Sequence, residues 1–482
     1  MIFNSVTFLL FLLVVVTLYW LLPTRARLVM LFSSSLMFYG FWRVEFLLVM
    51  LLSVVTDYFV ALWIAAADTK RRKFQFLLVS LFVNLGLLFY FKYLIFFTDN
   101  IVFLFQLAGF DVDPFMLNII LPLGISFYTF QTISYSVDVY RGLIKPERDF
   151  ILYGCYVTYF PQLVAGPILR AVEVIPQLAS RAPFSLNDVA TGARRILYGL
   201  FLKVVLADNI SPLVDDGFAM ELSALSAIDV WTLAFLFGFQ IYFDFSAYSH
   251  IALGCARMMG ICFPENFRFP YLASSPRDFW RRWHISLSSW IRDYLYLPLA
   301  GISVHDRSTG GLANATLDKS KNRALFLTWA IMGLWHGAAW SFMLWGLYHA
   351  IAITVYRLIR PFTVNLGRRL QILGGMAITL PVMMLSWIPF RTQDVSSALS
   401  MYVKIFDFHG YTWIGMRENT YLICAILLLG VVLTYVFREY IMPVYKRSAV
   451  LTILGEVPVF AVIAGLVFIF LRPISQFIYF QF

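Results

Sequence analysis

The chain has 482 residues, of which 61% are hydrophobic and 13% charged, and its mean hydropathy is +0.77. So many apolar runs with so little polar surface exclude a soluble globular protein and indicate a polytopic membrane protein. The formal net charge of +10 does not indicate a nucleic-acid partner, because the basic residues cluster in short loops between apolar segments, where they set orientation. The segments lack the alternating pattern of barrel strands, so the predicted fold class is all-α.

About twelve apolar segments are predicted to cross the membrane as helices. They are 5–22, 28–42, 44–66, 74–97, 117–136, 193–213, 228–254, 324–342, 345–358, 374–391, 420–437 and 453–471. The first is interpreted as a retained span, because it lacks a basic n-region and a small-residue cleavage site. Arg25, Arg27 and the basic run 70–73 follow spans one and three, which places both loops in the cytoplasm and the chain termini outside.

Two stretches do not fit this alternation. Residues 151–175 and 262–300 are rich in aromatic side chains but are broken by Pro, Gly and Arg. Such segments are typical of re-entrant or interfacial helices buried in protein on the cytoplasmic side. No soluble domain boundary is evident, and the predicted division is a transmembrane core over 1–450 and a C-terminal span with an aromatic tail over 451–482.

Several signatures of soluble enzymes are missing from the sequence. The four cysteines include no Cys-x-x-Cys pair, so neither a disulfide framework nor a zinc site is expected. There is no glycine-rich phosphate loop and no Gly-x-Ser-x-Gly elbow. ATP-driven transport and serine hydrolysis therefore lose their usual motifs.

The first candidate catalytic residue is His336, in the eighth predicted span. An ionisable side chain in hydrocarbon is costly and marks a functional site, and a neutral imidazole is a natural general base. Gly333 and Gly337 are expected to let another backbone or a thin substrate approach the ring, with Trp335 and Trp340 as rigid apolar walls. The alternative role is an interhelical hydrogen-bonding group.

The second candidate is His284, within a basic, tryptophan-rich segment. Arg281 and Arg282 precede it, and their guanidinium groups suit the phosphates of a donor such as coenzyme A or a carrier protein. The alternative is that these arginines are ordinary positive-inside residues at the membrane interface. Asp244 and His349 are further intramembrane polar groups, for which a structural role is the simpler interpretation.

The order of these motifs resembles the membrane-bound O-acyltransferase (MBOAT) family, in particular its bacterial branch of alginate O-acetyltransferase and teichoic acid D-alanyltransferase. The resemblance lies in residues 279–296 and 333–337, with further matches at 121–128, 160–170, 242–249 and 265–267. It implies a ring of helices around a thinned centre and a tunnel from a cytoplasmic donor site to an outer acceptor site. It also implies that His336 is the catalytic histidine and His284 the second active-site residue, without a metal or a permanently bound cofactor.

The resemblance implies an O-acyltransferase of the bacterial inner membrane. Its expected substrate is a short acyl group, acetyl, carried as a thioester by coenzyme A or an acyl carrier protein in the cytoplasm. The expected product is an O-acetylated exported polysaccharide, such as alginate, cellulose, peptidoglycan or another exopolysaccharide. An extracytoplasmic acetyltransferase is the expected protein partner.

The C-terminal residues 477–482, Phe-Ile-Tyr-Phe-Gln-Phe, resemble the terminal motif of a small single-span partner in teichoic acid D-alanylation. This resemblance implies that Tyr479 accepts the acyl group as a phenyl ester and passes it on, since a phenolate is a good leaving group. The alternative is an aromatic interfacial anchor.

Three other functions remain open from the sequence, and one of them, a scaffold for a polysaccharide synthase, leaves the two histidines unexplained. A lipid or protein O-acyltransferase that uses a long fatty chain would share the same motifs. A proton-coupled transporter or flippase would use intramembrane His and Asp residues as a relay, although the paired repeats typical of transporters are not evident.

Overall fold

The computed structural model describes residues 1, 3–113, 117–164, 166–302, 319–392, 394–442, 449–471 and 477, and every regular element in these ranges is a helix. Seven helical stretches of this part are long and apolar enough to cross a membrane: Phe46–Ala66, Lys70–Leu107, Leu186–Phe218, Ala227–Met258, Trp340–Thr363, Arg368–Arg391 and Glu418–Ile441. Val6–Leu21 and Gly455–Phe470 are shorter apolar helices. The all-α, membrane-embedded class predicted from the sequence is thereby confirmed.

Five of the twelve predicted spans are not among these seven stretches: two are the shorter apolar helices, and three coincide with helices that are in neither group. These three helices are α2 (Thr24–Gly40), α6 (Ile125–Tyr140) and α15 (Lys319–His336). The first and third carry several basic residues, and α6 has 16 residues that are almost all buried within the protein. The number of crossings and the central tunnel therefore stay predictions.

The chain divides into two compact units. The first unit comprises residues 1–196 and 248–264, and the second comprises 197–247 and 265–482. The first unit contains α1 (Val6–Leu21), α2, α3 (Phe46–Ala66), α4 (Lys70–Leu88), η1 (Phe89–Tyr93), α5 (Leu94–Leu107), α6, α7 (Phe150–Thr158), α8 (Ala171–Ala179) and most of α9 (Leu186–Leu200).

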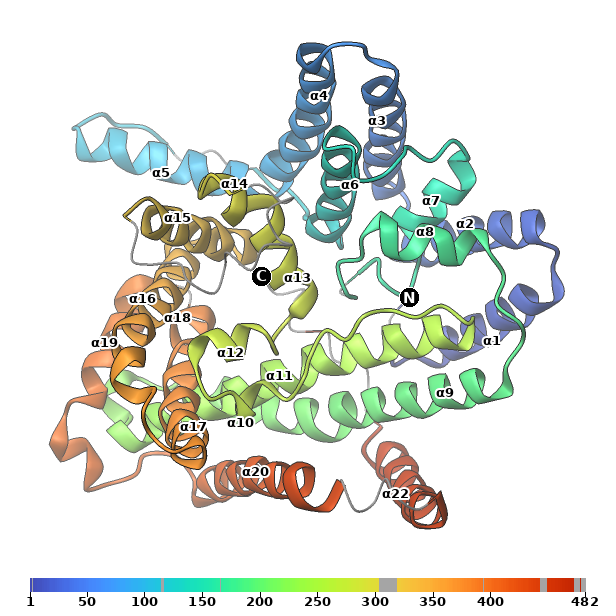
Figure 1. Ribbon diagram of the computed structural model, residues 1–482. Helices are drawn as coiled ribbons and strands as arrows, with labels where there is room; N and C mark the ends of the chain where they lie inside the picture. Colours follow the sequence, from blue (N-terminus) through green and yellow to red (C-terminus); the bar gives the residue numbers. More distant parts are fainter. Residues whose placement is uncertain are drawn as a thin grey trace. The chain divides into compact units, whose positions relative to one another are not determined.

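Helices α3, α4 and α6 of the first unit pack against one another (Figure 1). Their shared interior holds the carboxylate of Asp57, which is fully buried. Ser80 Oγ and Asn84 Nδ2 donate hydrogen bonds to it, each at 2.5 Å, and Ser136 Oγ donates a third. Because a buried carboxylate is tolerated only when it is hydrogen-bonded, these donors explain why α4 and α6 carry polar residues on their inner faces.

The second unit contains the remaining helices. They are η2 (Phe201–Ala207), α10 (Asp208–Phe218), η3 (Leu222–Ala224), α11 (Ala227–Met258, up to 247), η4 (Pro270–Leu272), α12 (Pro276–Trp280), α13 (Ile285–Ile291), η5 (Arg292–Tyr296), α14 (Leu297–Leu299), α15, α16 (Trp340–Thr363), α17 (Arg368–Leu385), α18 (Trp387–Arg391), α19 (Val395–Ile405), η7 (Phe408–Tyr411), α20 (Glu418–Val436), η8 (Phe437–Ile441) and α22 (Ala449–Phe470). Helix α22 corresponds to the predicted twelfth span.

Both stretches that did not fit a simple alternation consist of short helices with breaks between them. Residues 151–175 form α7 and α8, and 262–300 form the series from η4 to α14. Pro270, Pro276 and Pro298 each lie at the first or second position of such a helix, where proline is tolerated because its missing N–H has no intrahelical partner. Proline thus fixes where these short helices begin.

Candidate active site

All the candidate residues that the structure describes lie in the second unit. His284 links α12 to α13 and has no exposed surface. Its backbone is left-handed, with φ 42° and ψ 56°, a conformation that is uncommon for any residue except glycine. Such a conformation persists where surrounding contacts hold it, and it directs the imidazole into the protein rather than along α13.

Asn266 fixes the imidazole of His284. Asn266 Oδ1 lies 3.2 Å from His284 Nδ1 and also accepts hydrogen bonds from the amide of Ser286 at 3.2 Å and from its hydroxyl at 2.9 Å. The peptide group reinforces this contact, because Ile285 N–H donates to Asn266 O. An amide oxygen can only accept, so Nδ1 carries the proton and Nε2 keeps its lone pair.

The surroundings of His284 keep the ring neutral. Burial lowers the pKa of His284 to about 3, so the imidazole is uncharged at physiological pH. Phe245 packs edge-on against it at a centroid distance of 4.6 Å, and Phe267 lies at 6.4 Å. The site is therefore a buried, neutral hydrogen-bond acceptor between aromatic walls.

His336 is the last residue of α15, and its side chain is buried. The sequence predicted a helix over 324–342, but the structure ends α15 at His336 and begins α16 at Trp340. The prediction failed because the apolar pattern continues through the break, whereas Gly337 and an extended Ala339 turn the backbone. His336 thus lies at a helix C-terminus, where backbone carbonyls favour positive charge.

The walls around His336 differ in part from the expectation. Trp335 and Trp345 each lie 4.8 Å from the His336 ring, and Phe390 lies at 5.3 Å. Trp340, expected to line the slot, is 49% exposed, and Trp345 from the next turns of α16 contacts the imidazole instead. The hydrophobic side of this site is therefore built by α16 and α18 as well as by α15.

The glycines beside His336 serve the contact between α15 and α16, which pack along their length (Figure 1). A Cβ at Gly333 would lie 2.2 Å from Phe342 O, and one at Gly337 would lie 2.1 Å from the Phe342 ring. Gly346 on α16 meets Trp329 O in the same way, at 2.1 Å. The backbone of α16 therefore occupies the space beside Gly333, and the Phe342 side chain occupies the space beside Gly337.

One aromatic layer connects the two histidines. From the His336 ring it passes to Trp345 at 4.8 Å, from Trp345 to Trp387 at 6.2 Å, and from Trp387 to Trp283 at 4.9 Å. Trp283 directly precedes His284 in the chain. The structure therefore brings the two sequence-predicted histidines into one water-excluding layer.

Arg281 and Arg282 have different surroundings. Arg282 Nε pairs with Asp278 Oδ2 at 3.0 Å, whereas Arg281 is exposed. Partial burial together with the positive charges of Arg281, Arg357 and Arg360 lowers the pKa of Arg277, so each of these three arginines is near enough to act on Arg277. We call Arg277, Arg281, Arg357 and Arg360 the basic cluster; the sequence offered no sign that α16 contributes to it.

Asp244 is paired in the structure. Its carboxylate lies 2.7 Å from Lys203 Nζ, which also contacts Asp208 at 2.9 Å. Asp244 is 3% exposed and Lys203 is 9% exposed. This buried ion-pair group joins η2 to α11.

Two residues that sequence reasoning did not single out contact the site. Asn266 lies within the motif 265–267, but its role depends on the fold bringing it to His284, 18 positions later. Phe477, near the C-terminus, is 4% exposed and packs against Phe245 at 5.9 Å. Tyr479 lies outside the described residues.

Comparison with known proteins gives consistent matches. The model of the MBOAT, membrane-bound O-acyltransferase family matches residues 148–391. A probable alginate O-acetylase AlgI from Azotobacter vinelandii is 37% identical over 91% of this chain and 86% of its own length. A peptidoglycan O-acetyltransferase from Helicobacter pylori is 36% identical over 76% and 71%, and a teichoic acid D-alanyltransferase from Bacillus subtilis is 31% identical over 50% and 60%.

Proposed function

Because the chain belongs to the membrane-bound O-acyltransferase family and is an acyltransferase, we propose that it moves an acetyl group from a cytoplasmic thioester to an exported polysaccharide. Relatives named for O-acetylation of alginate and of peptidoglycan support acetyl as the acyl group and a glycan as the final acceptor. The proposed location is the bacterial inner membrane, with an extracytoplasmic partner that completes the transfer. Alginate is one candidate glycan among several.

The observation that carries the proposal is the pair of buried histidines in one aromatic layer, with His284 held as a neutral acceptor by Asn266. His336 is proposed to take the proton from the attacking hydroxyl as its oxygen adds to the thioester carbonyl. The carbonyl groups at the end of α15 stabilise the imidazolium that forms. When the tetrahedral intermediate collapses, the C–S bond breaks and the thiolate leaves with that proton, so an ester and a thiol result.

His284 is proposed to position the donor. Its Nε2 has a lone pair and Nδ1–H is already engaged by Asn266, so the neutral ring accepts a hydrogen bond from the donor rather than polarising a carbonyl. An amide N–H of a pantetheine arm has the matching chemistry. Coenzyme A and acyl carrier proteins both present such an arm.

The basic cluster is proposed to hold the phosphate groups of the donor. Guanidinium groups bind phosphate through paired N–H donors. Burial, together with the charges of the neighbouring arginines, lowers the pKa of Arg277, and an anion bound among these groups offsets that mutual repulsion. The positive-inside rule supports a cytoplasmic location for this cluster, where the thioester is available.

Tyr479 is proposed as an acyl carrier on the chain itself. Phe477 packs beside Phe245, which contacts His284, so the segment two residues before Tyr479 is near the candidate site. The tyrosine would receive the acetyl group as a phenyl ester and release it to the outer partner.

Radiolabelled thioesters supplied to inside-out membrane vesicles test the donor and the acyl length. We expect acetyl transfer to ester linkage and little transfer of palmitoyl; the reverse preference would indicate a long-chain acyltransferase. Mass spectrometry of the intact protein then tests Tyr479, with an acetyl adduct expected in the wild type and absent from Tyr479→Phe. Full polysaccharide acetylation by Tyr479→Phe would remove the carrier step and leave the acyltransferase proposal standing.

A further inference from the structure

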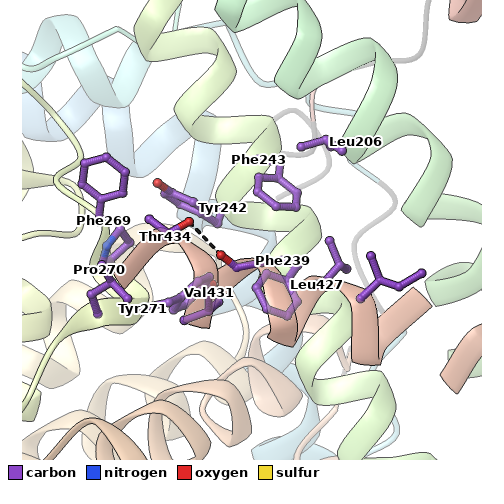
Figure 2. Close-up of a pocket in the computed structure, with 13 residues that line it drawn as sticks. Leu206, Phe239, Tyr242, Phe243, Phe269, Pro270, Tyr271, Leu427, Val431 and Thr434 are labelled. Atoms are coloured by element: carbon purple, nitrogen blue, oxygen red, sulfur yellow. Dashed lines mark hydrogen bonds between the residues drawn. The ribbon is translucent and has the colours of Figure 1, made fainter. Parts of the chain in front are cut away.

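The second unit also has a half-open apolar groove of about 300 Å³ (Figure 2). One wall comes from α20, and the other comes from α11 and the segment around η4. The lining residues are Leu206, Phe239, Tyr242, Phe243, Phe269, Pro270, Tyr271, Leu272, Ile426, Leu427, Gly430, Val431 and Thr434. Gly430 leaves space in the wall, because a Cβ there would have no neighbour within 4 Å.

The groove opens on a helix whose surface is suited to lipid. Helix α20 and η8 form a candidate span, and its apolar side chains Leu422, Ile426 and Leu429 are 56–61% exposed. In a bilayer such a surface faces acyl chains. A hydrocarbon chain therefore matches the lining of the groove better than water or a polar metabolite does.

The groove has a positive charge near one end. The guanidinium of Arg438 lies 4.5 Å from the centroid of the Phe269 ring. Arg438 follows Thr434 by four positions, so it lies about one helical turn beyond the last lining residue of α20. Phe269 itself has φ 50°, a left-handed backbone unusual for phenylalanine, and its ring is 43% exposed.

We propose that this groove binds an acyl chain of an anionic glycerophospholipid, whose phosphate is held by Arg438. The charge complementarity distinguishes this occupant from a zwitterionic lipid, because an arginine near the membrane surface favours anionic headgroups. The apolar lining from Ile426 to Thr434 takes part of the chain, and the arginine beyond it takes the headgroup.

The bound lipid also stabilises the packing of the aromatic residues between the groove and the candidate active site. Tyr242 in the groove wall packs against Phe267 at 5.9 Å and Trp283 at 6.0 Å. Phe267 lies 6.4 Å from the His284 ring, and Trp283 directly precedes His284 in the chain. A lipid in the groove therefore completes the packing on the side of the aromatic layer that faces the groove. This consequence holds whichever acyl group the enzyme transfers.

The test is native mass spectrometry of the delipidated full-length protein titrated with phosphatidylglycerol or phosphatidylethanolamine of identical chains. We expect tighter binding of phosphatidylglycerol, and about a fivefold loss of that preference in Arg438→Gln. Gly430→Leu should weaken binding of both lipids, because its side chain enters the groove. Gly465→Leu on α22 is the matched control, since Gly465 also has open space around its Cβ.

Three results would overturn the proposal. Equal binding of the two lipids by the wild type removes the role of Arg438, and an unchanged preference in Arg438→Gln does the same. Unchanged lipid binding in Gly430→Leu places the lipid elsewhere. If the lipid-free wild type is a dimer that Gly430→Leu converts to a monomer, the groove is a protein interface and the lipid assignment is wrong.

Discussion

The imidazole of His284 is defined by one amide group. Asn266 Oδ1 accepts hydrogen bonds from the His284 ring and from the Ser286 hydroxyl. The amide therefore cannot rotate without losing several hydrogen bonds. An acceptor beside Nδ1 selects the tautomer in which Nδ1 carries the proton, and burial keeps the ring from becoming a cation. The chemical state of this histidine is thus set by neighbours, whereas the residue type alone would permit either tautomer or the cation.

Asn266→Ala is expected to reduce acyl transfer on the order of 10²-fold, because Nε2 is no longer held as the acceptor. Asn266→Asp keeps an acceptor but adds a negative charge, which favours the imidazolium and raises the pKa of His284 from its low value. The rate of this variant should fall as the pH is lowered from 8 to 5, since Nε2 then becomes protonated. The rate of the wild type should show no such fall caused by protonation of His284, because the pKa of His284 is about 3.

The pH dependence of kcat/KM for the thioester, measured in reconstituted vesicles, checks this prediction. Identical profiles for the wild type and Asn266→Asp would contradict the proposed coupling between the two side chains. Ser289→Ala is a suitable control, because the Ser289 hydroxyl donates only to the neighbouring Ser286 carbonyl.

At the scale of elements, the hairpin of α15 and α16 positions His336. The glycine pattern around His336 correctly indicated a close helix contact, and Gly333 and Gly346 both lie against opposing carbonyl oxygens. The sequence could not locate the break after His336, because Gly337 and the alanines that follow are compatible with a helix. The helix ends after His336 because Phe342 packs over Gly337, and that contact depends on tertiary structure.

Gly333→Ala and Gly346→Ala are expected to destabilise the protein by about 1–3 kcal/mol each, because the added methyl overlaps a backbone carbonyl. Gly374→Ala on α17 is the control, since a Cβ there meets nothing within 4 Å and alanine favours a helix. Thermal unfolding in detergent measures the difference. Equal melting temperatures for all three variants would show that α15 and α16 can move apart without a loss of stability.

The ion-pair group of Lys203 joins η2 to α11. Lys203→Met should lower stability by about 3–5 kcal/mol, because it removes the cation that contacts the carboxylates of Asp244 and Asp208 inside the protein. Lys70→Met, at an exposed position, is the control. Folded yield and thermal unfolding are the measurements, and a Lys203→Met protein as stable as the control would refute a structural role.

For the whole molecule, composition and hydropathy were sufficient to predict an all-helical membrane protein. They were insufficient to count the crossings, because hydropathy assumes that lipid surrounds each helix. Helix α6 shows why this assumption fails: its Thr129, Gln131 and Ser134 are buried against other helices. The role of Asn266 was also beyond prediction, since it requires contacts that only the folded chain provides.

The charge distribution predicts orientation, with the basic run 70–73 at the start of α4 in the cytoplasm and Asp216 outside. In a Cys262→Ser background, Arg71→Cys should be shielded from a membrane-impermeant thiol reagent in intact spheroplasts and labelled after permeabilisation. Asp216→Cys should be labelled without permeabilisation. The opposite pattern would invert the topology and place the basic cluster away from the cytoplasmic thioester.

The central claim is that His336 drives acyl transfer to an exported glycan. Its most direct test is the O-acetyl content of polysaccharide from cells whose only copy of the gene carries His336→Ala. The comparisons are the wild type and His409→Ala, which changes an exposed histidine in η7. We predict a fall of at least about 10²-fold for His336→Ala and a wild-type level for His409→Ala. Unchanged O-acetyl content with His336→Ala present in the membrane at the wild-type amount would contradict the account.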